Sequence, residues 1–448
     1  MAKYKAYPEY KDSGVEWFDV MPMRWKVTRL KLETFMNMGQ SPSSDDCNIE
    51  GNGFAFLQGN AEFGKTNPIE KQYCPVAKKI ANPGDILFSV RAPVGAVNYA
   101  DKKYGIGRGL CSIAASAKVI SDFLWWLLPT YKYQLDAIAT GSTFEAVSAE
   151  QLGNLCFALP SISEQLQIAA FLDLETVKID NLIERQQQLI ELLKEKRQAV
   201  ISHAVTKGLN PDVPMKDSGV EWLGEVPEHW TIPKIGYFCE VTKLTGFEYT
   251  NHWRTDENGE IIALRGFNIK ERYLDLARAE KISNELSRKL SRSKLSVGDI
   301  VLPCTGTLGN ASIISSNNMF HINQNIAKLT FDESIYSEFA AYWLTSEPFR
   351  EMIEFNNTSG MQPVLLIGDI RNMPMPLPSI QEQIDISIYL NNKLNVYDFA
   401  IQRNEHAISL LSERRTALIS AAVTGKIDVR NWVAPDAEKT EVSQEATA

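Results

Sequence analysis

A seven-residue string occurs twice in this chain, and this repetition constrains the fold more than any other feature. Residues 11–17 and residues 216–222 both read Lys-Asp-Ser-Gly-Val-Glu-Trp. An identical string of this length is far beyond chance. The two copies also lie too far apart in the sequence to be the stacked units of a solenoid protein. The chain is therefore predicted to be a duplicated domain pair.

Two further blocks repeat in the same order, and their positions indicate where the halves differ. Gly84-Asp85-Ile86 recurs as Gly298-Asp299-Ile300. The block Leu-Pro-Ser-Ile at 159–162 recurs at 377–380, and Glu-Gln follows one residue later in both copies. The separation between the copies grows from each block to the next, so insertions fall between the matched blocks. Each half is predicted to contain a motif, a globular segment of variable length and a helix.

The last block of each half predicts the start of a long helix. Ser161 and Ser379 each stand three residues before a glutamate, which is the capping-box pattern. No glycine or proline follows until Gly208 in the first copy and Gly425 in the second, where we expect the helices to end. The first helix would run for about 45 residues and about 67 Å, and a helix of that length needs a partner helix.

Apolar residues in the two helical segments follow the sevenfold spacing of a coiled coil. Two polar interruptions recur in the same register, Gln186 with Asn404 and Arg197 with Arg415. They either fix the register of the helices or are only solvated at the helix edge, and both interpretations stay open. The simplest arrangement is an antiparallel pair that acts as a spacer. The predicted contact residues are Leu172, Ile179, Ile183, Ile190 and Leu193 in the first helix, and Leu390, Tyr397, Ile401, Ile408 and Leu411 in the second.

The globular segments at 23–158 and 228–376 are predicted to be mixed α/β, because short strand-like runs precede loops rich in Gly, Ser, Thr and Arg. The predicted fold class is α+β, with two α/β domains in a pseudo-twofold arrangement, separated by two long antiparallel coiled-coil helices. The remaining segments are the N-terminal motif at 1–22, the helices at 159–208 and 377–427, the linker with the second motif at 209–227, and a disordered acidic tail at 428–448.

Four loop pairs correspond between the halves, and their polar residues differ while framework residues are kept. Arg, Gln, Asn, Ser and Thr can read base edges in DNA, with Arg suited to guanine and Asn or Gln to adenine. Ordinary turns use Gly, Asn and Ser as well, so a structural role is the competing interpretation for each residue. The candidates for base reading are Gln58, Asn60, Arg91, Arg108, Ser142 and Thr143 in the first half, and Arg265, Asn268, Thr305, Thr307, Gln324 and Asn325 in the second.

The formal net charge of −9 argues against DNA binding unless basic residues cluster locally or partner proteins supply positive charge. The best basic cluster lies between Lys281 and Lys294. Such residues either contact phosphates, which positions a protein without specifying sequence, or form a solvated face. The candidates for phosphate contact are Lys78, Lys79, Arg288, Lys289, Arg292 and Lys294.

Sequence motifs for catalysis are missing, so we expect no catalytic residues. The chain has no Pro-Pro dipeptide, which the Asn/Asp-Pro-Pro-Tyr/Phe motif of adenine methyltransferases requires, and no Gly-x-x-x-x-Gly-Lys-Ser/Thr nucleotide loop. Its six cysteines are scattered and its five histidines lack paired spacing, which disfavours a metal site and fits a reducing cytoplasm. A structural coiled-coil adaptor without sequence reading is the alternative, but it leaves the divergent polar loops unexplained.

Taken together, these motifs resemble the specificity subunits of Type I restriction–modification systems. The resemblance covers nearly the whole chain. It rests on the Lys-Asp-Ser-Gly-Val-Glu-Trp motif, the Gly-Asp-Ile strand and the Leu-Pro-x-Ile-x-Glu-Gln helix start, each present twice. It implies two target-recognition domains, each reading half of an interrupted target in double-stranded DNA, with the helix pair setting the gap.

The resemblance also implies partner proteins. Two modification (methyltransferase) subunits would dock on the helix pair and bring S-adenosylmethionine, and restriction (translocase/endonuclease) subunits would bring ATP and Mg. This chain itself would bind no cofactor and no membrane, and the complex would be cytoplasmic.

Overall fold

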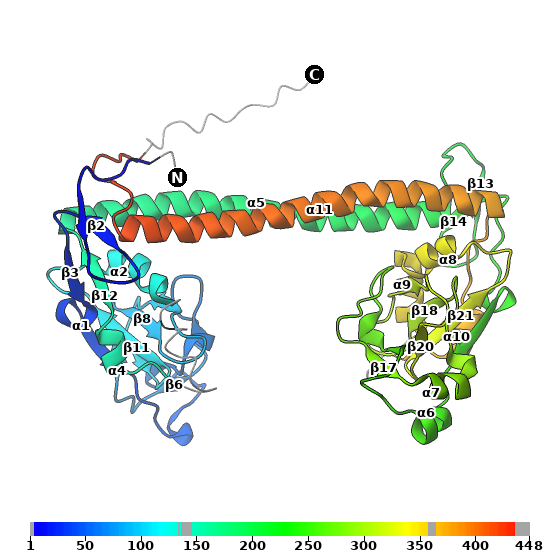
Figure 1. Cartoon of the computed structure of the whole chain (residues 1–448), viewed down its shortest axis with the longest axis horizontal. Helices are drawn as coiled ribbons and strands as arrows, with labels where there is room; N and C mark the ends of the chain where they lie inside the picture. The colour runs from blue at the N-terminus through cyan, green and yellow to red at the C-terminus, as the bar shows by residue number, and fades with distance from the viewer. Residues whose placement is uncertain (1–3, 133–134, 136–145, 357–363, 435–448) are drawn as a thin grey trace. The chain divides into compact units, whose positions relative to one another are not determined.

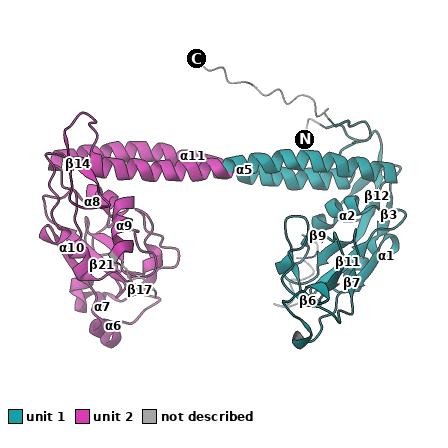
Figure 2. Ribbon diagram, turned by 180° about the vertical axis from the view of Figure 1, so that it is seen from behind, with its two compact units in different colours: residues 1–186, 406–448 teal, residues 187–405 magenta. Residues whose placement is uncertain are grey.

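The computed structural model describes residues 4–132, 135, 146–356 and 364–434 (Figure 1). The chain divides into two compact units (Figure 2). Unit 1 contains residues 1–186 and 406–448, and unit 2 contains residues 187–405. The division cuts both long helices, so each unit combines one globular domain with part of each helix.

The two long helices are α5 (Ile162–Lys207) and α11 (Ile380–Val423), with 46 and 44 residues. In α5 the predicted capping box is complete, because Glu164 N donates to Ser161 Oγ at 3.4 Å and Ser161 N donates to Glu164 Oε2 at 3.2 Å. Among the described residues, neither these nor any other helix is long and apolar enough to cross a membrane.

Within each unit the helix segments lie side by side (Figure 1). In unit 1 the start of α5 packs against the end of α11, and in unit 2 the end of α5 packs against the start of α11, so the segments are antiparallel. All ten predicted contact residues are buried or half-buried.

The matched arginines form ion pairs across these helix segments. Arg197 Nε donates to Asp398 Oδ1 at 2.9 Å in unit 2, and Arg415 Nε donates to Asp180 Oδ1 at 2.7 Å in unit 1. In the register of the repeat, Asp398 is the counterpart of Asp180, just as Arg415 is the counterpart of Arg197. One ion pair is therefore the repeat of the other with the helices exchanged. This geometry supports the register-fixing interpretation of the arginines.

The two domains have matching sheets, which extends the duplication beyond the sequence motifs, except that among the described residues the second sheet has four strands in unit 1 and three in unit 2. Each has an antiparallel sheet with a long central strand and a second sheet that contains one parallel pair, β5 with β10 in unit 1 and β16 with β20 in unit 2. The sheets of unit 1 are, in strand order, β4 (Phe35–Met38), β11 (Leu110–Ala114), β8 (Ile86–Ser89), β9 (Val97–Tyr99), and β6 (Tyr73–Cys74), β5 (Phe54–Leu57), β10 (Tyr104–Ile106), β7 (Ile80–Ala81). Those of unit 2 are β15 (Cys239–Lys243), β21 (Ile326–Phe331), β18 (Ile300–Pro303), β19 (Ser312–Ile313), and β17 (Glu280–Ile282), β16 (Ile261–Leu264), β20 (Phe320–Ile322).

Short helices and hairpins complete the two units. Unit 1 adds the hairpin β1 (Tyr10–Asp12) and β2 (Val20–Pro22), the pair β3 (Lys26–Arg29) and β12 (Cys156–Leu159), and the helices α1 (Leu30–Glu33), α2 (Ser121–Leu127) and α4 (Ala149–Gly153). Unit 2 adds the hairpin β13 (Met215–Asp217) and β14 (Glu225–Pro227), and the helices α6 (Gly246–His252), α7 (Asn284–Lys289), α8 (Ser337–Leu344), α9 (Glu347–Asn356) and α10 (Ile367–Asn372).

A second, buried tryptophan follows each repeated motif, Trp25 in the first half and Trp230 in the second, and contacts the start of a long helix. Trp25 Nε1 donates to Glu164 Oε1 at 3.2 Å, and Trp230 Nε1 donates to Glu382 Oε1 at 3.0 Å. The capping glutamate therefore has a second role, because it satisfies an indole N–H that burial would otherwise leave unpaired. This contact explains why the tryptophan and the glutamate recur together.

The glutamine that closes the Leu-Pro-x-Ile-x-Glu-Gln block joins the helix to the domain. Gln165 is buried, accepts from Ile120 N at 3.0 Å and donates to Lys118 O at 2.7 Å. Gln383 is buried in the same way and accepts from Tyr336 N at 2.8 Å. Each glutamine thus satisfies backbone groups just ahead of the first domain helix that packs on the long helix.

The predicted disordered tail at 428–448 is wrong for its first residues. Asp428 N donates to Lys5 O at 2.8 Å, Val429 is buried, and the Trp432 ring meets Phe171 edge to face at 5.5 Å. Burial of the apolar side chains of Val429 and Trp432 offsets the conformational entropy lost when this segment becomes ordered. The prediction of disorder rested on the acidic residues further along the tail and overlooked these two side chains. Residues 435–448 lie outside the described residues.

Candidate nucleic-acid interface

Three of the predicted loops of unit 1 meet at one edge of the domain. Strands β5 and β10 are parallel neighbours, so the loops that follow them, 58–60 and 107–109, leave the sheet at the same edge. The end of β8 lies there too, because Ser89 pairs with Leu110 at the start of β11. Val90 N donates to Gly109 O at 2.9 Å and joins two of the loops. We name residues 58–60, 90–93 and 107–109 the reading loops of unit 1.

Polar side chains of these reading loops are open to solvent. Gln58, Arg91 and Arg108 are exposed, and Asn60 is half-buried. Gln58 Nε2 donates to Ser41 Oγ at 2.9 Å, and Arg108 N donates to the same oxygen at 3.2 Å. Within the described part of the chain, neither arginine guanidinium of these loops is engaged in a hydrogen bond or an ion pair.

Three residues of unit 1 show the limits of the loop prediction. Ser41 lies beside Gln58 and Arg108, but no repeated block marks it in the sequence, so it was not predicted. Ser142 and Thr143 were predicted and lie outside the described residues. Val147, which follows them in the sequence, contacts the reading loops, because Val147 N donates to Val90 O at 2.8 Å.

The corresponding loops of unit 2 converge in the same way. The parallel strands β16 and β20 place loops 265–268 and 323–325 at one edge. Cys304 N donates to Asn325 O at 2.7 Å, which brings in the loop after β18. Thr307 Oγ1 donates to Gly266 O at 3.3 Å. We name residues 265–268, 303–307 and 323–325 the reading loops of unit 2.

Arg265 is the most prominent side chain of these loops. Its side chain is 48% exposed, and its NH1 donates to Glu280 Oε1 at 2.7 Å. Its guanidinium lies 5.5 Å from the centre of the Phe267 ring. Thr307 is exposed and Thr305 is half-buried. An exposed ion pair of this kind contributes about 0–1 kcal/mol, so Arg265 can exchange its partner at little cost.

The structure contradicts the assignment of Asn268 as a base reader. Asn268 is 1% exposed, its Oδ1 accepts from Arg265 N at 2.8 Å, and its Nδ2 donates to Asp275 O at 2.8 Å. Its amide therefore closes the short 3-10 helix at Gly266–Asn268. Gln324 and Asn325 are half-buried, and Gln324 Oε1 is buried without a partner among the described residues.

The predicted phosphate contacts of unit 2 lie close together on one segment. Arg288 and Lys289 occupy the last turn of α7, and Arg292 follows it; all three are exposed. Lys294 is half-buried. In unit 1, Lys78 and Lys79 are exposed just before β7.

A buried histidine supports this basic segment from the core. His321 on β20 is fully buried, and its Nε2 lies 3.3 Å from Ser287 O on α7. Burial lowers the pKa of His321 to about 4, so the ring is neutral at physiological pH. The positive charge of the segment thus comes from its arginines and lysines.

Comparison with known proteins places the chain in a family. A family model described as the Type I restriction modification DNA specificity domain matches residues 24–195 and 227–405. Each match contains one copy of the repeated fold with its reading loops. The chain belongs to the Type I restriction–modification DNA specificity family. As a Type I DNA specificity subunit, it is a non-catalytic recognition protein rather than a structural adaptor.

Individual relatives agree with this Type I specificity assignment. Over 182 residues the chain is 39% identical to a Methanocaldococcus jannaschii protein described as "Putative type I restriction enzyme MjaX specificity subunit"; the matched segment covers 39% of this chain and 42% of that protein. Over 452 residues it is 24% identical to the MjaIX specificity subunit of the same organism, which covers 96% and 99%. A solved structure from a study of complex assembly in the type I R-M system has the same fold, with a TM-score of 0.70, 16% identity and coverage of 91% and 99%.

Proposed function

We propose that each domain of this Type I specificity subunit reads one half of a bipartite target in double-stranded DNA. The observation that carries the proposal is the convergence, in each unit, of the loops whose polar residues differ between the copies. Two copies of one fold that carry different polar side chains in their reading loops are suited to reading two different short DNA sequences. The major groove offers such tips a distinct pattern of donors and acceptors for every base pair.

The arginines of the reading loops are the strongest candidates for base contacts. Arg91 and Arg108 in unit 1 are exposed, and neither guanidinium has a hydrogen bond or ion pair among the residues that the structure describes. In unit 2, Arg265 would exchange its exposed pair with Glu280 for guanine O6 and N7. The exchange is favourable because the ion pair contributes about 0–1 kcal/mol and a bidentate guanine contact contributes about 1–3 kcal/mol of discrimination. Gln58, Thr305 and Thr307 would add further contacts.

Phosphate contacts would position the domains without adding sequence information. The candidates are Lys78 and Lys79 in unit 1 and the α7 segment, with Arg288, Lys289, Arg292 and Lys294, in unit 2. Since the whole chain has a net charge of −9, we propose that the partner subunits supply much of the positive charge around DNA.

Exposed leucines on the long helices support docking of two modification subunits. Leu192 on α5 is 61% exposed and Leu410 on α11 is 51% exposed, and they are counterparts in the register of the repeat. Large apolar side chains in solvent are typical of protein interaction sites when they form a patch, and Val396 and Phe399 are also exposed on α11. The modification subunits would bring S-adenosylmethionine, and restriction subunits would bring ATP and Mg, in the cytoplasm.

A selection experiment tests the proposal. The complex of this chain with its modification subunits is incubated with a random duplex library, and the bound DNA is sequenced. We expect a two-part motif with a fixed gap. Arg91→Ala should alter one part only, and Arg265→Ala the other part only. If no motif is enriched, or if either substitution alters both parts alike, the proposal is wrong.

A further inference from the structure

A hairpin in unit 2 joins the reading loops to the long helices. Ile269 pairs with Leu274, and Lys270 N donates to Tyr273 O at 3.0 Å, which makes residues 269–274 a tight hairpin directly after loop 265–268. Ser312 Oγ donates to Lys270 O at 3.0 Å and fixes the hairpin to the domain. We name residues 269–274 the latch hairpin.

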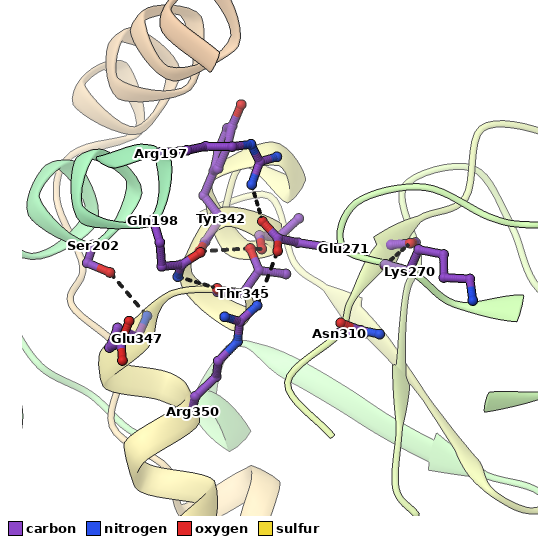
Figure 3. A network of polar contacts seen from close by, with 12 residues as sticks. Arg197, Gln198, Ser202, Lys270, Glu271, Asn310, Tyr342, Thr345, Glu347 and Arg350 are labelled. Carbon is purple, nitrogen blue, oxygen red and sulfur yellow. Dashed lines mark hydrogen bonds and ion pairs between the residues drawn. The ribbon is translucent and has the colours of Figure 1, made fainter. Parts of the chain in front are cut away.

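Glu271 at the tip of the latch hairpin bridges two arginines from different elements. Its Oε1 accepts from Arg197 NH1 on α5, and its Oε2 accepts from Arg350 NH2 on α9 at 3.2 Å (Figure 3). Arg197 is also the residue that pairs with Asp398 on α11. Burial lowers the pKa of Arg197, but the carboxylates of Glu271 and Asp398 outweigh burial and raise the pKa above its ordinary value. The tip carboxylate is thus held beside the ion pair that joins α5 and α11 in unit 2.

Arg272 makes a second set of contacts from the same tip. Its NH2 donates to Glu338 Oε2 on α8 at 3.0 Å and to Asn391 Oδ1 on α11 at 3.2 Å. Its guanidinium stacks 3.4 Å from the centre of the Tyr342 ring. The φ angle of Arg272 is +67°, a left-handed conformation that a residue with a side chain adopts only when its surroundings impose it. Tip and helices together line a cavity of about 520 Å³.

In the part of unit 1 that the structure describes, the matching hairpin makes no such contacts. Phe63 pairs with Pro68, and the tip residues 64–67 bond to their own domain, as Asn67 Nδ2 does to Tyr99 O at 2.9 Å. Among the described residues, no hydrogen bond or ion pair joins this tip to α5 or α11. Arg415, the counterpart of Arg197, binds Asp180 and lies 5.9 Å from the Trp126 ring centre. The latch is therefore a property of one copy of the repeat.

We propose that Glu271 and Arg272 are positioning residues that hold the reading loops of unit 2 at a set orientation to the helix pair, and that they thereby determine how strictly the gap between the half-sites is measured. This inference rests on the proposed bipartite reading. The latch hairpin follows Arg265 within a few residues, so a tilt of the hairpin moves the loop that reads DNA. The apolar core that Trp343 shares with Ile201 and Leu390 holds the body of the domain to the long helices. The latch hairpin adds polar contacts next to the reading loops, where a small tilt would change the fit to a longer or shorter gap.

The test compares binding to the selected target with binding to targets whose gap is one base pair longer or shorter. Arg272→Gly is the key variant, because glycine favours the positive φ and the hairpin keeps its backbone while the guanidinium contacts are lost. Glu271→Gln keeps the side-chain shape and removes the charge. Asn318→Gly is the matched control, because Asn318 also has a positive φ of 60° in unit 2 and is exposed.

The measured quantity is the ratio of binding to the altered-gap targets over binding to the selected target. We expect both latch variants to raise this ratio by about fivefold, because each loses one or two partly buried ion pairs. The control should leave the ratio unchanged. The inference is overturned if the ratio stays at the wild-type value in both latch variants, or if binding to all targets falls in parallel, as a merely structural role would produce. If the wild-type complex selects no two-part target at all, the proposed function fails instead.

Discussion

Replacing each helix-ending glycine by alanine tests how the repeated motifs close the two units. Gly208 and Gly425 end α5 and α11 with φ angles of +74° and +78°. Alanine in this conformation costs about 1–2 kcal/mol. At Gly208 the added Cβ would meet Trp230 Cζ2 at 3.3 Å, a contact that small shifts relieve. Gly208→Ala should therefore lower the stability of unit 2 by about 1–2 kcal/mol.

The same substitution at Gly425 meets a tighter neighbour. The added Cβ would lie 2.5 Å from Cδ and Cγ of Pro22 and 3.0 Å from Cζ3 of Trp25, and a proline ring cannot rotate away. Overpacking of this kind costs about 1–3 kcal/mol, so Gly425→Ala should lower the stability of unit 1 by about 2–5 kcal/mol in total.

Native-state hydrogen exchange measured peptide by peptide reports the opening free energy of each unit separately. The expected result is a larger loss in unit 1 of Gly425→Ala than in unit 2 of Gly208→Ala. Each variant leaves the other unit as its internal control. Equal losses, or a smaller loss for Gly425→Ala, would refute the reasoning from the Pro22 contact.

Two further predictions concern charge. Burial lowers the pKa of His321 to about 4, so between pH 4 and pH 6.5 the unfolded chain binds a proton that the folded chain does not. The free energy of unfolding is therefore highest above pH 6.5 and falls as the pH drops toward 4. The expected loss between pH 7.5 and pH 5 is about 2 kcal/mol. Hydrogen exchange of unit 2 at both pH values measures this, and a loss that persists unchanged in His321→Asn would contradict it. Lys289→Ala should weaken binding to all DNA sequences alike and make the slope of log K against log salt shallower by about one; an unchanged slope in a salt titration would exclude a phosphate contact.

The repeated features of the chain are the ones that the sequence predicted well. The capping serines, the glycine helix ends and the matched arginines follow from local chemistry that recurs in both copies. The second capping box is only half formed among the described residues: Glu382 N donates to Ser379 Oγ at 3.3 Å, but the Glu382 carboxylate binds His229 and Trp230. The convergence of the loops was not predicted, because it depends on parallel pairing between strands that are distant in sequence. A duplication thus served as an internal comparison that one sequence usually lacks.

Features present in only one copy could not be predicted. An asparagine in a loop reads the same whether it contacts a base or caps a 3-10 helix, and only the burial of Asn268 separates the two roles. Glu271 and Arg272 look like ordinary turn residues, because their partners on α5, α8 and α11 are distant in sequence. Val429 and Trp432 order the start of the tail through contacts with unit 1 that no local pattern marks.

Mapping methylated adenines in DNA from cells that express this chain with its modification subunits tests bipartite reading most directly. The account predicts a single two-part motif with a fixed gap, in which Arg91→Ala relaxes one half and Arg265→Ala relaxes the other half. A contiguous motif, or a two-part motif in which both substitutions relax the same half, would contradict it.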